Sequence, residues 1–110
     1  MHTKNEQLIR KLISKSESGD IRWSITEVAN QYILHISEKM IVVTKSSSMG
    51  NSRVIFEIKN DDGSIIDSMS KVLGSSASRD AELLSALYDA ARRNAKRINE
   101  AIDSLLSELD

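Results

Sequence analysis

The stretch Asp80–Leu109, DAELLSALYDAARRNAKRINEAIDSLLSEL, decides the fold of this chain. Two apolar sets recur in it every seven residues, offset by four. The sets are Leu84, Ala91, Ile98 and Leu105, and then Tyr88, Ala95, Ile102 and Leu109. Spacings of three and four place both sets on one face of an α-helix. We therefore expect one long amphipathic helix here, against which the middle of the chain packs.

The start of this helix is marked more clearly than its end. Ser78 is an expected N-cap, because its hydroxyl can accept a hydrogen bond from a free backbone amide. Asp80 and Glu82 follow in the first turn, where carboxylates interact favourably with the helix dipole. Glu108 and Asp110 place negative charge where the dipole favours positive charge, so we expect the last turn to fray.

The heptad pattern allows two modes of packing. It extends over nearly four heptads, which is typical of a coiled coil. Ala91 and Ala95, however, form a thin seam suited to close approach to a sheet or to another helix of the same chain. Intramolecular packing is the favoured interpretation, and pairing of the part beyond Ile98, through Ile102 and Leu105, with another chain is the alternative.

The chain before this helix divides into one short helix and several strands. The first helix is expected over about Lys4–Ser16, with Gly19 as its stop. Ile21–Ala29 is expected to be extended and anchored in the core by Trp23. Alternating or β-branched segments predict strands at Tyr32–Ser37, Met40–Lys45, Arg53–Lys59 and, more weakly, Ile65–Ser70. The connections are expected at Ser46–Ser52, at a turn containing Gly63, and at Lys71–Ala77.

Segregation of strands and helices along the chain is typical of α+β domains. We expect a single domain over residues 1–110, built as an antiparallel meander of three to four strands. The N-terminal helix and the long C-terminal helix are expected to cover one face of that sheet. The register of the last strand stays open, because two-residue and three-residue turns give different partners for Ile66 and Asp67.

Composition excludes several classes of function. The chain contains no cysteine, which rules out disulfides, thiolate catalysis and cysteine-based zinc sites. A net charge of -1 is atypical of a general polyanion binder. No segment is apolar enough to span a bilayer, and the N-terminus is too polar for a secretory signal, so a cytoplasmic protein without membrane contact is expected.

The second face of the sheet is one candidate interaction surface. If Leu34 and Phe56 face the helices, then Ile33, His35 and Ile55 face away from them. Either the Ile21–Ala29 segment covers these residues, or they are scattered surface residues, or they bind a protein partner or a second copy of the chain.

A basic cluster on the last helix is a second candidate surface. It comprises Arg92, Arg93, Lys96 and Arg97. Such a cluster is usually a solvated helix face, and binding of an anion or nucleic acid is the functional alternative. Few aromatic residues accompany it, which disfavours nucleic acid.

Candidate catalytic and metal-binding groups are few. His2 is terminal, and His35 is the one histidine placed by a strand, where a surface role is far commoner than general-base catalysis. Asp61, Asp62 and Asp67 lack calcium-loop spacing, and the Gly74-Ser75-Ser76 segment lacks the spacing of nucleotide-binding loops. We therefore expect no enzyme activity, no metal and no cofactor.

Several features together resemble a group of small, uncharacterised bacterial and phage-encoded α+β proteins. They are the apolar N-terminal helix, Gly19 followed by Ile21 and Trp23, the Asp62-Gly63 turn, and the closing helix with Leu84, Leu87, Tyr88 and Ala91. The resemblance implies a bacterial or phage origin and carries no function. The sequence as a whole favours a non-enzymatic protein-interaction module, with self-association as a homodimer included.

Overall fold

The computed structural model describes residues 3–48, 50–74 and 78–110. Its fold is α+β, with one antiparallel sheet and three helices. The elements are α1 (Thr3–Ser18), β1 (Ser24–Ile25), β2 (Gln31–Ile36), β3 (Lys39–Ser48), β4 (Asn51–Asn60), β5 (Ile65–Leu73), α2 (Arg79–Ala95) and α3 (Ile98–Leu109).

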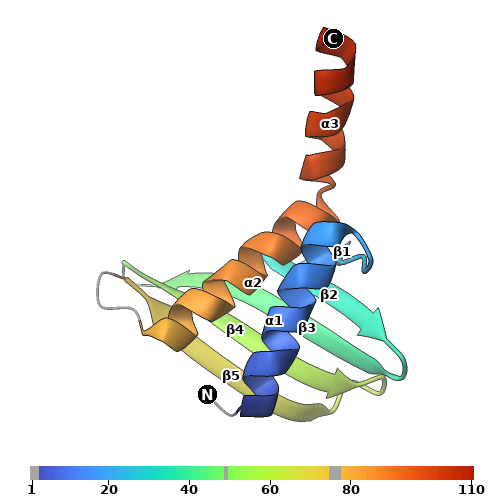
Figure 1. The fold of residues 1–110 in the computed structure, drawn as a ribbon. Helices are drawn as coiled ribbons and strands as arrows, with labels where there is room; N and C mark the ends of the chain where they lie inside the picture. The colour runs from blue at the N-terminus through green and yellow to red at the C-terminus, as the bar shows by residue number, and fades with distance from the viewer. Residues whose placement is uncertain (1–2, 49, 75–77) are drawn as a thin grey trace.

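The sheet is a five-stranded meander in the order β1-β2-β3-β4-β5. Helices α1 and α2 lie across one of its faces, and α3 projects away from the body (Figure 1). The meander and the helical layer agree with the predicted architecture. The prediction of three to four strands was one short, because the two-residue β1 adds an edge through pairing of Ser24 with Ile33 and Ile25 with Tyr32.

The core lies between the sheet and these two helices. Cross-strand register aligns Tyr32, Val43, Phe56 and Met69 on the inner face. Their neighbours from α1 are Ile9 and Leu12, and α2 contributes Leu84, Leu87, Tyr88 and Ala91. Trp23 also enters the core, where it is 2% exposed, so its predicted role as an anchor is confirmed.

The hairpin between β3 and β4 is longer than predicted. Ser46–Ser52 was expected to be a loop, yet β3 continues to Ser48 and β4 begins at Asn51, while Met49 lies outside the described residues. Ser47 pairs with Ser52 across the two strands, and their hydroxyl oxygens lie 3.3 Å apart. Ladder pairing therefore overrides the weak strand propensity of serine.

The turn before β5 contains a bulge. Asp62 accepts hydrogen bonds from the backbone and the hydroxyl of Ser64, and Gly63 has a φ of 91°. Ile58 pairs with Asp67 and Lys59 with Ile65, so Ile66 is the extra residue. Strand β5 then extends to Leu73, which places the start of the expected Lys71–Ala77 connector inside the sheet; residues 75–77 lie outside the described part of the chain.

The predicted C-terminal helix is interrupted. Ser78 caps α2 as expected, through a 3.1 Å hydrogen bond from the Ala81 amide to its hydroxyl. The helix ends at Ala95, and Arg97 adopts a left-handed conformation with a φ of 55° before α3 begins. The expectation of one continuous helix packed on the sheet was therefore wrong. Arg22 Nη1 lies 3.5 Å from the Asn94 carbonyl oxygen, the acceptor that Ile98 would use in an unbroken helix.

Candidate functional site

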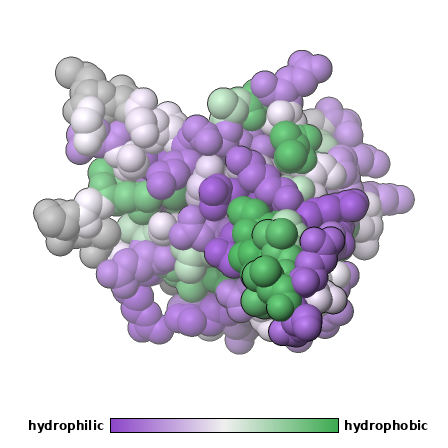
Figure 2. Space-filling view, turned by 90° about the horizontal axis from the view of Figure 1, so that it is seen from above, coloured by the Kyte–Doolittle hydropathy of each residue, from purple (hydrophilic) through white to green (hydrophobic). Residues whose placement is uncertain are grey.

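Helix α3 carries the most exposed apolar surface in the described part of the chain. From Glu100 onward every residue is exposed. The exposed fractions are 44% for Ile102, 60% for Leu105, 56% for Leu106 and 83% for Leu109. Together with Ile98 and Ala101, these residues follow three- and four-residue spacing along one side of the helix. We call these six residues the α3 stripe. Figure 2, viewed from above, shows apolar side chains gathered beside hydrophilic ones where α3 points at the viewer.

The other side of α3 is acidic. Glu100 and Asp103 lie there, Glu108 borders the stripe, and α3 itself contains no lysine or arginine. Lys96 and Arg97 lie directly before the helix and are both exposed. The helix therefore has an apolar stripe, an acidic polar face and a basic approach segment.

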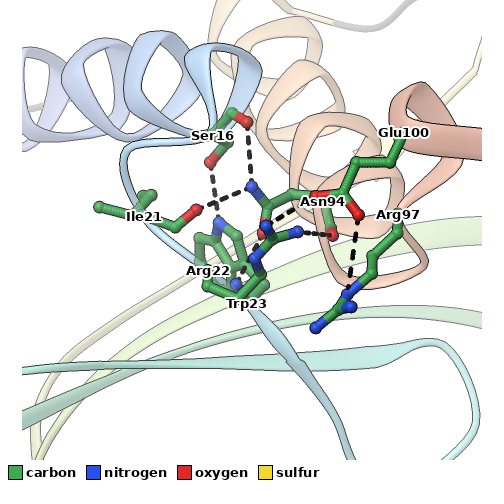
Figure 3. A network of polar contacts seen from close by, with 7 residues as sticks. All are labelled: Ser16, Ile21, Arg22, Trp23, Asn94, Arg97 and Glu100. Carbon is green, nitrogen blue, oxygen red and sulfur yellow. Dashed lines mark hydrogen bonds and ion pairs between the residues drawn. The ribbon is translucent and has the colours of Figure 1, made fainter. Parts of the chain in front are cut away.

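A buried polar network fixes the point from which α3 departs (Figure 3). The Asn94 carboxamide accepts a 2.7 Å hydrogen bond from the Trp23 backbone amide and donates to the carbonyl oxygens of Ser16 and Ile21, at 3.0 and 2.8 Å. The Trp23 indole donates to the Ser16 hydroxyl at 2.8 Å, and that hydroxyl donates to the Leu12 carbonyl. The end of α2 is thereby joined to the segment that follows α1.

An ion pair continues this network into α3. Arg22 Nη2 lies 2.8 Å from Glu100 Oε1, and Arg97 Nε lies 4.0 Å from Glu100 Oε2 (Figure 3). The hydrogen bond from Arg22, together with the positive charges of Arg22 and Arg97, lowers the pKa of Glu100 from its ordinary value. Arg22 thus links the first turn of α3 to the body at the position where the helix changes direction.

The outer face of the sheet contains the predicted residues Ile33, His35 and Ile55. Ile33 pairs with Val42, and Ile55 pairs with Thr44, so the face has an apolar centre. Val42 is 3% exposed, and Ile33, Ile55 and the neighbouring Gln31, Glu57 and Lys59 are all half-buried. Residues of the face thus shield one another, since long polar side chains can cover apolar neighbours with their carbon stems. His35 lies exposed near the end of β2.

The Ile21–Ala29 segment does not cover this outer face. Its strand β1 extends the sheet at the edge of β2, and Trp23 points into the core on the helix side. Ile25 and Val28 remain exposed. The alternative in which this segment shields Ile33 and Ile55 was therefore wrong, because β1 lies at the edge of the sheet and Trp23 anchors it from the helix side.

The predicted basic cluster is divided by the helix geometry. Arg92 borders a depression with Tyr88 and Lys45, whereas Arg93 and Arg97 border another beside Ser16 and Gly19. Carboxylates of Glu17, Glu100 and Asp103 line the second depression as well. Lys96 is exposed between these two sides. Three of the four cations thus border two different depressions, one of which also contains three carboxylates, and anion binding stays a prediction.

The described residues provide no assembled metal site. Among them, no three histidine, aspartate or glutamate side chains converge, and His2 lies outside the described range. No helix in residues 3–48, 50–74 or 78–110 combines the length and apolarity that crossing a bilayer requires.

Two groups of residues were missed in the sequence. Leu106 belongs to the α3 stripe, and the spacing within Ile98–Leu109 alone would have identified it. The second group is the network at the helix junction, formed by Ser16, Arg22 and Asn94. Asn94 contacts residues that lie more than 70 positions away in the sequence. Local patterns contain no signal for such contacts.

Comparisons with known proteins return no relative for this chain. It matches no protein-family model, and neither the curated proteins nor the solved structures include a significant match.

Proposed function

We propose that the protein is a non-enzymatic protein-interaction module and that α3 is its docking element. The supporting observation is the α3 stripe, whose Ile102, Leu105, Leu106 and Leu109 are 44 to 83% exposed on a helix that projects from the body. The partner that fits this surface is another amphipathic helix with an apolar stripe and basic groups beside it.

Helix stability argues for a partner. Isolated helices shorter than about 12 to 15 residues are marginal in water. Helix α3 has 12 residues, and its apolar side chains make few contacts with the body. A packed apolar face is what normally stabilises a helix of this length, so a second helix against the stripe would supply the missing stabilisation.

The energetic gain is sufficient for reversible binding. Burying one leucine or isoleucine side chain contributes about 1.5 to 3 kcal/mol. The exposed parts of the four large stripe residues therefore contribute about 4 to 7 kcal/mol, and a matching partner stripe about as much again. Association costs at least about 4 kcal/mol, so the expected dissociation constant is on the order of micromolar or weaker.

The charge on α3 selects among partners. Interfacial membrane helices usually carry lysine and arginine on their polar face to attract anionic lipids. Helix α3 presents Glu100, Asp103 and Glu108 and has no basic residue. A helix that carries basic residues, or that directly follows them in its chain, is electrostatically complementary to this face, whereas an anionic lipid surface is not.

The proposal is tested with a fluorescent synthetic peptide that has a leucine stripe and lysine flanks. A peptide of the same composition, scrambled to break the stripe, is the peptide control. Binding to the full chain is measured by anisotropy for wild type, for Leu105→Ser with Leu109→Ser, and for the polar-face control Ser104→Asn with Ser107→Asn. We expect at least about tenfold weaker binding for the stripe variant only.

A further variant addresses the outer sheet face. Ile33→Thr keeps a β-branched residue in β2 and removes apolar surface from that face. If Ile33→Thr weakens peptide binding and the stripe variant does not, the docking site lies on the outer sheet face and not on α3. Binding that is absent in wild type, or equal for the scrambled peptide, would refute the proposal.

A further inference from the structure

We propose that the helix that docks on the α3 stripe is α3 of a second copy, paired antiparallel about a twofold axis between Asp103 and Ser104. This inference rests on the proposed function and names the partner of that surface. It is supported by the order of apolar residues along the stripe, the distribution of charge along α3, and the accessibility of the helix.

The stripe is complementary to itself when reversed. With the axis between Asp103 and Ser104, Ile98 lies opposite the partner's Leu109, and Ile102 lies opposite the partner's Leu105. Ala101 then lies opposite the partner's Leu106, so a small residue meets a large one. Every residue of the stripe has an apolar counterpart, as an isologous twofold interface requires.

Charge favours the antiparallel arrangement over the parallel one. Lys96 and Arg97 lie directly before α3, Glu108 lies in its last turn, and Asp110 follows it. Arg97 precedes α3, and its Nε lies 4.0 Å from Glu100 Oε2 of its own helix, but its carbonyl accepts from the Ala101 amide, so its backbone begins the helical spiral. Eleven residues are about three helical turns, which places Glu108 on the same flank of the stripe as the Arg97 backbone. In an antiparallel twofold pair, like flanks face each other, and Glu108 therefore meets the partner's Arg97. A parallel pair would bring the acidic ends together, and the helix dipoles would also repel.

The position of α3 permits this pairing. The helix projects from the body, and its residues from Glu100 onward are exposed (Figure 1). An antiparallel pair places the two bodies at opposite ends of the paired helices. The seam is smaller than a standard protein interface, so the dimer is reversible and its dissociation constant is on the order of micromolar.

Disulfide trapping tests the orientation, because the chain contains no cysteine of its own. Full-length Ile98→Cys and Leu109→Cys chains are oxidised separately and as a mixture, and the products are identified by mass spectrometry. We expect cross-links in the mixture between position 98 of one chain and position 109 of the other. Each variant alone should cross-link no more than Ser68→Cys, an exposed β5 position that reports random collisions.

A charge exchange provides a second measurement that does not depend on the cysteine variants. Arg97→Glu should raise the dimer dissociation constant, measured by sedimentation equilibrium, about tenfold. Arg97→Glu combined with Glu108→Arg should restore it, because the antiparallel pair regains opposite charges on facing flanks. The corresponding control is Arg53→Glu with Glu57→Arg on the sheet, which should leave the constant unchanged.

The outcomes separate this inference from the proposed function. Efficient cross-linking of each single variant with itself would show a parallel pair and overturn the antiparallel arrangement. A monomer at every concentration, with cross-linking at the level of Ser68→Cys, would overturn self-pairing altogether. In both cases the stripe-dependent binding of the synthetic peptide would still be judged by its own experiment.

Discussion

The carboxamide oxygen of Asn94 accepts a 2.7 Å hydrogen bond from the backbone N–H of Trp23, which joins the end of α2 to the segment after α1. The amide nitrogen of the same side chain donates to the carbonyl oxygens of Ser16 and Ile21. One side chain that is 7% exposed thus satisfies three backbone groups. The buried side-chain nitrogen and oxygen atoms in the described part of the chain all have partners, so the network is complete.

Asn94→Ala should therefore be strongly destabilising. The substitution removes the partner of the Trp23 amide and of the Ile21 carbonyl, whereas the Ser16 carbonyl still accepts from the Gly19 amide. Each unsatisfied buried group costs about 1 to 3 kcal/mol. We expect a loss of about 2 to 4 kcal/mol in the free energy of unfolding, because water reaches part of the site. Chemical denaturation followed by the fluorescence of Trp23, the one tryptophan, measures the change. Asn51→Ala, at an exposed position, should change stability by less than about 0.5 kcal/mol.

The Arg22–Glu100 pair should be detectable through the pKa of Glu100. The Arg22 hydrogen bond is the largest cause of its lowering, so Arg22→Ala should raise the pKa of Glu100 toward the ordinary value of 4.5. A carboxylate with a lowered pKa stabilises the fold above its unfolded pKa and loses that contribution as the pH falls through the folded value. Titration of the Glu100 side-chain carbon by NMR measures the shift.

A distant arginine provides the control for this titration. Arg53 on β4 donates to the Ser70 hydroxyl, far along the chain from α3. Arg53→Ala should leave the pKa of Glu100 where it is in wild type. An unchanged pKa in Arg22→Ala would mean that the 2.8 Å contact is not populated in solution.

Local patterns predicted the elements with a strong hydrophobic period. In the strands, Tyr32 alternates with Leu34 and Val54 with Phe56, and in α1 Ile9 and Leu12 have helical spacing. All six side chains enter the core. The Ser78 cap and the Gly63 turn depend on chemistry within a few residues, which a sequence displays directly.

The break in the C-terminal helix had no such signal. Glycine and proline, the residues that usually interrupt helices, are both absent from positions 96 and 97, which are Lys96 and Arg97. The heptad pattern continues through both positions. The interruption instead coincides with contacts of Arg22 to the Asn94 carbonyl and to Glu100, which lie 72 and 78 residues away. A non-glycine residue in the left-handed region costs about 1 to 2 kcal/mol, so tertiary contacts must offset it. The exposure of the α3 stripe follows from that break.

Ala91 should be sensitive to enlargement. It is fully buried against the core, whereas Ala95 in the same seam is half-buried. Ala91→Leu should lower the free energy of unfolding by about 1 to 3 kcal/mol through overpacking, and Ala95→Leu should lower it by less. Ala86→Leu, at an exposed position of α2, is the matched control and should be near neutral. Equal effects at Ala86 and Ala91 would contradict the observed packing of α2 on the sheet.

Tyr88 should titrate at unusually high pH. Burial, followed by the electrostatic interaction with the Tyr32 side chain, raises the pKa of Tyr88 from 10.0 to about 12. The centroids of the two rings lie 5.6 Å apart. A tyrosine with a raised pKa stabilises the fold fully below pH 10, and that contribution is lost as the pH rises toward 12. Tyrosinate absorbance should show a step near pH 12 that Tyr88→Phe removes. Removal of a step near pH 10 instead would indicate that the hydroxyl is solvated.

A chain that ends after Arg97 should keep the body of the fold. Helix α3 contributes no member of the buried core cluster, and its contacts with the body include the exposed Arg22–Glu100 pair. Exposed ion pairs contribute about 0 to 1 kcal/mol and Ile98 is only half-buried, so the truncated chain should lose no more than about 2 kcal/mol at low protein concentration. The proposed pairing of α3 would stabilise the folded state by mass action, so the full chain should become more stable as its concentration rises, while the truncated chain should not. Denaturation by urea at several concentrations measures both effects. A loss of several kcal/mol at low concentration would show that α3 packs on the body in solution.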